Sequence, residues 1–304
     1  MLKKLTLLIL PIYLLFGEEL YVLNNGDNTV TVISIPDNTF IKNFPLSTPI
    51  DSDLFGITIA PNNQIAYITS NNDTDSTGDQ LTTLQLYDTN IVTDISNGIG
   101  LNLPYFSAIS PNGQFLWIPN YDNNTISIIN TSDNSLAYLI GEGLLLNEPW
   151  SCAITPDGAY AWIVNYPTTN ISIISTLDNS LVTNFDAGSE SNLGIAFSPD
   201  GAHAWLTNNQ NGRIYIIRTS DGFTLNSINP DSALDSPAGI AFSSSGDYVY
   251  VANQGNNSIL VIDANNYELV TTIPSNGFLS NPTGIAINDS LFQSTFKHPS
   301  NHRQ

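Results

Sequence analysis

The chain has 304 residues, with 27 acidic residues against 7 Lys and Arg, so its formal net charge is -20. No Lys or Arg occurs between Asn43 and Gly212. Because nucleic-acid binding depends on basic side chains that neutralise phosphates, this charge distribution argues against a nucleic-acid partner. The only cysteine, Cys152, rules out an internal disulfide and a zinc site built from several cysteines. It falls in an apolar strand, where we expect a buried and unreactive thiol.

Residues 1–17 predict a secretory signal peptide. A basic start, Met1-Leu-Lys-Lys, precedes an apolar run from Leu5 to Phe16, and Gly17 is a small residue suited to cleavage. The run is shorter than the roughly 20 residues that a membrane-spanning helix needs. We therefore expect a secreted or periplasmic protein with no membrane span after cleavage. A retained anchor is the alternative.

Six near-copies of one short phrase follow, and the gaps between their aromatic residues are 46, 50, 45, 43 and 45 residues. The copies are Tyr21-Val-Leu-Asn, Tyr67-Ile-Thr-Ser, Trp117-Ile-Pro-Asn, Trp162-Ile-Val-Asn, Trp205-Leu-Thr-Asn and Tyr250-Val-Ala-Asn. A fixed period in this range indicates a repeat architecture. Since the aromatic residues recur in register, we expect them in the core between neighbouring repeats.

The repeat that begins at Gly194 shows what one period contains. Gly194-Ile-Ala-Phe predicts a short apolar strand, and Pro199-Asp-Gly predicts a tight turn after it. His203-Ala-Trp-Leu-Thr and Ile214-Tyr-Ile-Ile predict two further strands, and the segment from Phe223 predicts a fourth. Four short strands in each period of this length are typical of a β-propeller blade. The fold class expected is therefore all-β.

Three phrases that recur in register resemble the YVTN family of β-propeller repeats, over roughly residues 20 to 289. They are the aromatic phrase given above, the phrase from Gly194 to Gly201 before it, and phrases such as Asn257-Ser-Ile-Leu-Val-Ile-Asp after it. The departures from the pattern are Ser70 in place of Asn, Pro119 within the aromatic phrase, and Ser244-Ser-Gly in place of Pro-Asp-Gly. The resemblance implies a β-propeller, and members of this family often have seven blades.

The two ends of the repeat region complement each other. Tyr21 belongs to a second strand with no first strand before it, whereas Gly284-Ile-Ala-Ile is a first strand with no aromatic phrase after it. Pairing the two fragments in one mixed blade closes a ring of six blades and removes exposed edges. Seven blades, with one repeat lost at the C-terminus, is the alternative. We expect the propeller domain to span 18–289, followed by a disordered tail at 290–304.

Ligand sites in such rings form from loops on one face, around the central channel. We expect contacts from the loops between strands two and three and between strand four and the next strand one, with aromatic side chains as anchors. The candidate ligand-binding residues are Tyr121, Asp122, Glu148, Trp150 and Tyr166. The Asn that ends most aromatic phrases recurs too regularly for a ligand role, so we expect it to bond the loop backbone.

A calcium site is the one metal site that the sequence suggests. Asp73, Asp75 and Asp79 occupy alternate positions around Gly78, as at the start of a calcium-binding loop. The twelfth position is Leu84 rather than the Glu that closes such a site, so a plain polar turn is the favoured interpretation. No other cofactor is expected.

We expect a non-catalytic scaffold that binds a protein, peptide or glycan through its loop face. No Ser-His-Asp or Cys-His arrangement can be assembled within the ring, which makes an enzyme the less favoured class. The alternative is a metal-dependent hydrolase of the lactonase type, the most plausible enzyme relative, with carboxylates that converge on the channel. The loops could supply Asp51, Glu142, Glu148 and Asn165 for it. A truncated, non-functional paralogue with bare sheet edges is the third hypothesis.

Overall fold

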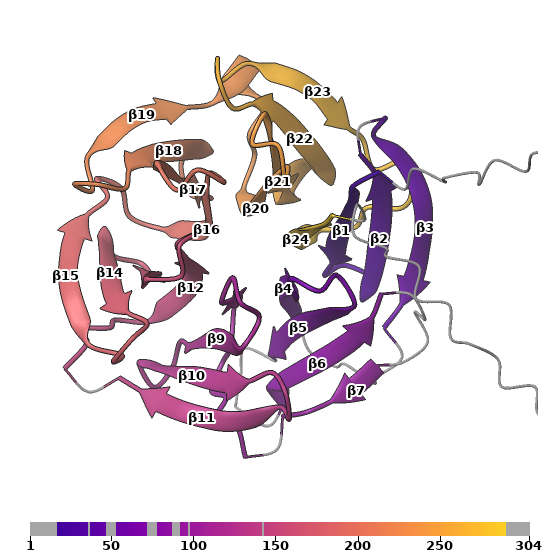
Figure 1. The fold of residues 1–304 in the computed structure, drawn as a ribbon. Coiled ribbons are helices and arrows are strands. Elements are labelled where there is room, and N and C mark those ends of the chain that lie inside the picture. Colours follow the sequence, from indigo (N-terminus) through magenta and orange to yellow (C-terminus); the bar gives the residue numbers. More distant parts are fainter. Residues whose placement is uncertain are drawn as a thin grey trace, which may run out of the picture.

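A computed structural model describes residues 17–289, apart from 36, 47–52, 72–77, 87–91, 97 and 142. Six four-stranded antiparallel sheets stand as blades around a central axis (Figure 1), which confirms the all-β propeller and the count of six blades. Residues 1–16, nearly all of the expected signal peptide, and the expected tail at 290–304 lie outside this description. Within the described residues, no helix is long and apolar enough to cross a membrane.

Blades 1 to 3 run around the first half of the ring. Blade 1 contains β24 (Pro282–Asn288), β1 (Glu19–Asn24), β2 (Thr29–Ser34) and β3 (Thr39–Pro45). Blade 2 contains β4 (Asp53–Ile59), β5 (Ile65–Asn71), β6 (Gln80–Gln85) and β7 (Val92–Asp94). Blade 3 contains β8 (Ala108–Ile109), β9 (Phe115–Asn120), β10 (Thr125–Asn130) and β11 (Ser135–Ile140).

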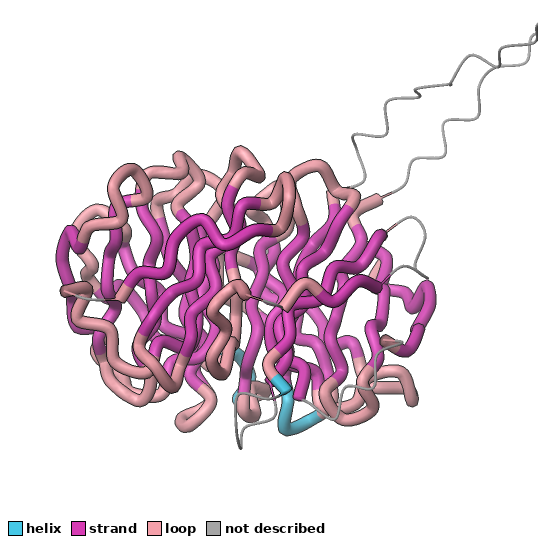
Figure 2. The backbone as a smooth tube through the Cα atoms, turned by 90° about the horizontal axis from the view of Figure 1, so that it is seen from below, coloured by secondary structure: helices cyan, strands magenta, loops and turns pink. Residues whose placement is uncertain are grey.

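Blades 4 to 6 complete it. Blade 4 contains β12 (Pro149–Ile154), β13 (Tyr160–Asn165), β14 (Asn170–Ser175) and β15 (Leu181–Asp186). Blade 5 contains β16 (Asn192–Phe197), β17 (His203–Asn208), β18 (Arg213–Arg218) and β19 (Thr224–Ile228). Blade 6 contains β20 (Pro237–Phe242), β21 (Tyr248–Asn253), β22 (Ser258–Asp263) and β23 (Leu269–Ile273). Two short 3-10 helices, η2 (Pro230–Ser232) and η3 (Gln254–Asn256), lie on one loop face (cyan, Figure 2).

The ring closes as the complementary ends predict. Strand β24 pairs antiparallel with β1, so that Ala286 lies opposite Tyr21 and Ile285 opposite Val22. The innermost strand of blade 1 therefore comes from the C-terminal end of the ring, and its other three strands come from the N-terminal end. This pairing satisfies backbone groups that two open edges would leave bare.

The core consists of six hydrophobic clusters, one at each junction between neighbouring blades. Each contains one strand-two aromatic residue, and all of these are at most 2% exposed: Tyr21, Tyr67, Trp117, Trp162, Trp205 and Tyr250. Trp162, for example, makes edge-on contacts with Phe185 of its own blade and Phe197 of blade 5. Burial of one large apolar side chain contributes about 1.5–3 kcal/mol, so these residues hold the blades together, as expected.

The inner strands approach one another closely wherever the first-strand phrase begins with Gly. A Cβ on Gly284 would lie 2.5 Å from the carbonyl oxygen of Phe55, and one on Gly239 would lie 2.5 Å from that of Thr283. At the position where four blades have Gly, blade 4 has Ser151 and blade 3 has the much larger Phe106. The apolar phrase Phe106-Ser-Ala-Ile predicts a four-residue strand, but the inner strand of blade 3 is only the two-residue β8.

Candidate functional site

Repeat positions that agree from blade to blade serve the fold. The phrase-ending Asn residues are almost fully buried at 24, 120, 165, 208 and 253. In blade 4 the side-chain oxygen of Asn165 accepts the backbone N–H of Asn147 at 3.0 Å, and its Nδ2 donates to Ser172 Oγ at 2.9 Å. Asn120 bonds Asn102 and Ser127 in the same way. These bonds tie each blade to the loop that enters it, which confirms the structural role.

Positions that differ between blades are the informative ones, and the first immediately precedes the first-strand phrase. Blades 2, 3 and 4 have large aromatic residues there: Phe55, Tyr105 and Trp150. Blades 5, 6 and 1 have small or aliphatic residues there: Leu193, Ala238 and Thr283. One half of the inner ring is therefore aromatic and the other half is not.

A second differing position follows the phrase-ending Asn. Blades 3 and 4 have Tyr121 and Tyr166 there, whereas blades 1, 5 and 6 have the amides Asn25, Asn209 and Gln254. This position belongs to the loops between strands two and three, on the same face as η2 and η3, at the bottom of Figure 2. The two departures from the repeat fall on the same face and on adjacent blades.

The side chains at these two positions form one contiguous group, here named the aromatic cluster: Phe55, Tyr105, Tyr121, Trp150 and Tyr166. Tyr105 and Trp150 stack with ring centroids 3.6 Å apart and an interplanar angle of 20°. Tyr121 stands edge-on to Trp150 at 5.7 Å, and Tyr166 packs on Trp150 at 4.9 Å. Tyr105 is buried, whereas the other four rings are partly exposed and so available for contact.

Two carboxylates flank the aromatic cluster. The hydroxyl of Tyr121 donates to Glu148 Oε2 at 2.9 Å. Burial, the hydrogen bond to Glu148 and the nearby charges of Glu148 and Asp122 together raise the pKa of Tyr121 to about 12. The phenol therefore stays neutral at physiological pH, keeps its own proton and donates it in the hydrogen bond to the carboxylate of Glu148.

Loop backbone bonds position Glu148. Its N–H donates to Asn124 Oδ1 at 2.6 Å, and its carbonyl oxygen accepts the N–H of Tyr166 at 3.0 Å. The residue has a φ of +50°, a left-handed conformation that is uncommon outside Gly and Asn. Neighbouring loops therefore hold Glu148 and Tyr166 in a fixed relation to each other.

The indole nitrogen of Trp150 is an unusual feature of the cluster. Nε1 is buried and has no hydrogen-bond acceptor among the described residues. A buried donor without an acceptor costs about 1–3 kcal/mol. The apolar side chains of Leu193 and Ala238, at the equivalent positions, carry no such cost. A contribution to the stability of the fold therefore does not by itself explain why Trp occupies position 150.

All five predicted ligand-binding residues lie in the described structure. Tyr121 contacts both Glu148 and Trp150, Trp150 contacts Tyr166, and the exposed Asp122 follows Tyr121 in the chain. Phe55 and Tyr105, which complete the cluster, were not predicted from the sequence. The signal was present, because both occupy the same repeat position as Trp150.

The structure describes only some of the candidate metal-binding residues. Asp73 and Asp75 lie outside the described residues, as do Asp51 and Glu142 of the lactonase hypothesis. Asp79 is described, and its Oδ2 accepts the backbone N–H of Leu103 at 2.8 Å. Among the described residues, no three His, Cys, Asp or Glu side chains lie close enough together to hold a metal ion.

Cys152 has the environment expected for a buried thiol. It is 4% exposed and packs in the cluster between blades 3 and 4. Its Sγ lies 3.3 Å from the carbonyl oxygen of Trp117, and burial raises the pKa of the thiol. A thiol with a raised pKa is a poor nucleophile.

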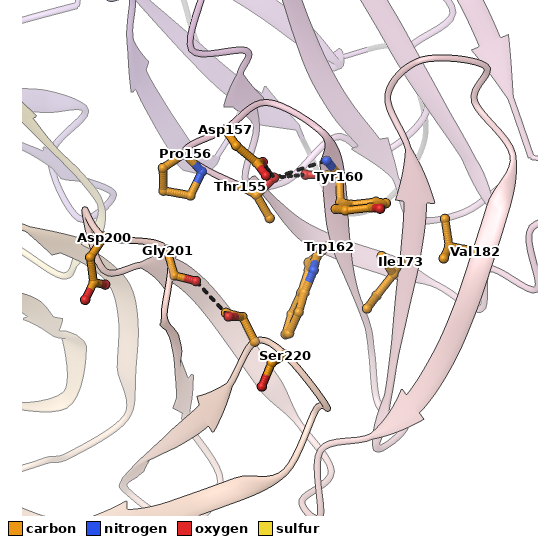
Figure 3. A pocket seen from close by; sticks show the side chains of 11 residues that line it. Thr155, Pro156, Asp157, Tyr160, Trp162, Ile173, Val182, Asp200, Gly201 and Ser220 are labelled. Atoms are coloured by element: carbon orange, nitrogen blue, oxygen red, sulfur yellow. Dashed lines mark hydrogen bonds between the residues drawn. The ribbon is translucent and has the colours of Figure 1, made fainter.

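The opposite face carries a series of grooves between blades. The one between blades 4 and 5 has a volume of about 410 Å³ and is lined by Thr155, Asp157, Trp162 and Asp200, among others (Figure 3). Equivalent grooves lie between blades 5 and 6, 3 and 4, and 2 and 3. Because they recur where strand-two aromatics meet the Pro-turns, they follow from the architecture and do not single out one site.

Comparison with protein families gives a partial match. Residues 193–290 match the family described as "Lactonase, 7-bladed beta-propeller", which is about a third of the chain. The matched segment covers blades 5 and 6 and strand β24 and contains no member of the aromatic cluster. No curated protein matches the sequence.

Solved structures share the fold at low sequence identity. A chain from the crystal structure of a nidogen/laminin complex has a TM-score of 0.73 and 15% identity, covering 90% of this chain and 98% of that chain. A protein of unknown function from Bacteroides caccae has a TM-score of 0.67 and 11% identity, covering 90% and 99%. Hydrazine synthase of Kuenenia stuttgartiensis has a TM-score of 0.60 and 17% identity, covering 84% and 83%. These likenesses establish the β-propeller class and nothing finer.

Proposed function

We propose that this chain is a secreted or periplasmic, non-catalytic binding scaffold, and that its ligand contacts the aromatic cluster on the loop face. One observation carries the proposal. At the position before the first-strand phrase, three blades have large aromatic residues: Phe55, Tyr105 and Trp150. The other three blades have Leu193, Ala238 and Thr283 there. A residue needed only for the repeat fold would recur in every blade.

The composition of the cluster supports a binding role. Partly exposed Tyr and Trp side chains supply large, rigid contact area and are the residues most often found at the energetic centre of interfaces. The Nε1 of Trp150, which has no acceptor among the described residues, also supports a binding role, because it marks a place where the fold gives up stability. A propeller in a nidogen/laminin complex is an example of the same fold in a protein assembly.

The proposal is tested by screening the purified chain on peptide and glycan arrays beside the Trp150→Leu variant. The variant installs the residue that blade 5 has at this position, so we expect the ring to fold and binding to disappear. Tyr138→Ser is the matched control, since Tyr138 is an aromatic residue, 54% exposed, on the outer strand β11. Binding that survives Trp150→Leu but not Tyr138→Ser would place the site elsewhere and overturn the proposal.

The partial family match favours one second candidate, a metal-dependent hydrolase of the lactonase type with its site at the channel. This candidate predicts hydrolysis of simple lactones that stops on chelation and returns with a divalent cation. Turnover that is unaffected by Trp150→Leu but abolished by EDTA would support it over the scaffold.

A further inference from the structure

We infer that the aromatic cluster takes a cationic side chain, guanidinium or alkylammonium, presented by a peptide segment of a partner protein. The inference rests on the proposed binding role of this face and names the chemistry of the ligand. It follows from three features: aromatic side chains that are partly exposed, carboxylates beside them, and the distribution of basic residues around the propeller.

The rings supply the first part of a cation site. A cation over the face of Trp or Tyr is attracted by the negative face of the π-system, and Trp is the strongest partner. Phe55, Tyr121, Trp150 and Tyr166 are all partly exposed and lie within 4.5 to 6.2 Å of a neighbouring ring in the cluster. Several partly exposed rings therefore lie close enough together to contact one bound group.

The carboxylates supply the second part. Glu148 is held against the cluster by the hydroxyl of Tyr121 and by the backbone bonds of its own loop. Asp122 adds an exposed negative charge next to the same hydroxyl. A hydrogen bond between a charged donor and a carboxylate is about twice as strong as one between two neutral groups.

The third feature is that, in the part of the chain that the structure describes, the blades that carry these carboxylates have no basic side chain. Among the described residues, the Lys and Arg are Lys42, Arg213 and Arg218, in blades 1 and 5. Arg213 bonds Ser227 and Arg218 pairs with Asp221, both within blade 5. Blades 2, 3 and 4, which build the cluster, contain no Lys or Arg at all. A ligand that brings its own positive charge would balance Glu148 and Asp122.

The extent of the cluster favours a peptide over a free amine. Its rings come from three successive blades, from Phe55 of blade 2 to Trp150 and Tyr166 of blade 4. A single small cation covers only part of this surface, whereas a peptide can place one basic side chain beside Glu148 and lay its neighbours along the remaining rings. A neutral glycan would stack on the same rings but would gain little from the two carboxylates.

Tryptophan emission gives a local readout of binding. Trp117, Trp162 and Trp205 are 2% exposed, whereas Trp150 is partly exposed, so a ligand at the cluster changes mainly the emission of Trp150. The probes are Gly-Ser peptides with one central Arg, Lys or citrulline, free arginine amide, and the neutral oligosaccharide chitotetraose. Citrulline keeps the shape of Arg and removes the charge.

We expect saturable quenching by the Arg and Lys peptides, about tenfold weaker binding of the citrulline peptide, and weaker binding of free arginine amide than of the Arg peptide. Glu148→Gln should weaken binding of the Arg peptide about tenfold, because the substitution removes the negative charge and keeps the shape of the side chain. Glu268→Gln is the matched control, since Glu268 is exposed on the opposite face, and it should bind as the unmodified chain does.

Equal binding of the Arg and citrulline peptides, or tighter binding of chitotetraose, would overturn the cationic ligand while leaving the binding role of the face intact. If free arginine amide binds as tightly as the Arg peptide, the inference that a peptide presents the cation is wrong. Absence of quenching by every probe also overturns the inference. The proposed function fails separately, and only if no array ligand depends on Trp150. Circular dichroism of each variant confirms that it folds.

Discussion

The rings of Tyr105 and Trp150 stack across the boundary between blades 3 and 4, with centroids 3.6 Å apart. The backbone joins the same two segments: the N–H of Phe106 donates to the carbonyl oxygen of Trp150 at 3.1 Å, and the N–H of Cys152 donates to that of Phe106 at 3.3 Å. The inner strand of blade 3 therefore pairs partly with blade 4 instead of fully with its own blade. Backbone hydrogen bonds therefore join the segments of blades 3 and 4 that carry Tyr105 and Trp150.

Collisional quenching tests the exposure of Trp150. In the Trp150→Leu variant we expect the acrylamide-accessible part of the tryptophan emission to disappear, because Trp117, Trp162 and Trp205 are each 2% exposed. The free energy of unfolding should change by less than about 2 kcal/mol, since the new residue matches Leu193 and removes an unsatisfied donor. An accessible component that persists in the variant would contradict this environment.

Alkaline titration tests the contact between Tyr121 and Glu148. Subtracting the phenolate absorbance of Tyr121→Phe from that of the unmodified chain should isolate one tyrosine with a pKa of about 12. Because the pKa is raised in the folded state, this group stabilises the fold fully below the ordinary tyrosine pKa near 10, and the contribution is lost as the pH rises towards 12. In Glu148→Gln the pKa should move back down. An unchanged pKa would show that the contact with Glu148 does not contribute to the shift.

Removing the buried amide of blade 4 tests the role of the repeated Asn. Asn165→Ala removes the hydrogen bonds to Asn147, Asn170 and Ser172 and leaves their polar groups without a partner. We expect a loss of about 2–4 kcal/mol in the free energy of unfolding, measured by denaturant titration. Asn112→Ala, in an exposed turn, is the control and should cost well under half as much.

The close approach of the inner strands makes a steric prediction at the ring closure. Gly284→Ala would place a Cβ 2.5 Å from Phe55 O and 3.0 Å from Ile57 N, both backbone atoms, so we expect it to destabilise the fold by about 3 kcal/mol. Gly277→Ala meets no atom within 4 Å and should cost only the strain of its positive φ, about 1 kcal/mol. Thermal unfolding of both variants checks the order, and equal effects would contradict the packing.

Calcium dependence is tested by thermal unfolding in calcium and then in EDTA. We expect the same midpoint in both, because Leu84 stands where a calcium loop needs Glu and Asp79 accepts a backbone hydrogen bond from Leu103. A clear rise with calcium would instead indicate a metal site at Asp73, Asp75 and Asp79 or at the channel. A screen for lactone hydrolysis would then follow.

Most of the fold was predictable because the same pattern of strands and turns recurs in six copies along the sequence. The aromatic residue of strand two, the Pro-turn and the complementary ends of the ring each recur or match in register, so their meaning does not depend on one local pattern. The shortened inner strand of blade 3 was not predictable, because Phe106-Ser-Ala-Ile has the composition of a strand. Only the position of blade 4 shows that this backbone pairs across the blade boundary.

The site was predictable only in part, for a related reason. Tyr121, Glu148, Trp150 and Tyr166 stand out as aromatic or acidic residues in loops. Phe55 and Tyr105 were missed because each adjoins an apolar strand and has the character of a core residue. Their meaning emerges when the six copies are aligned and the position before each first-strand phrase is compared. The contact between Tyr121 and Glu148, 27 positions apart, needs the coordinates.

The closure of the ring also determines how it responds to mechanical force. Glu19 and Asn288 are opposite each other at one end of the antiparallel ladder between β1 and β24. Tension applied through these two ends therefore loads the hydrogen bonds one pair at a time, as in a zipper, instead of shearing all of them together. Blade 1 should open at low force, with the other five blades still folded as an open arc.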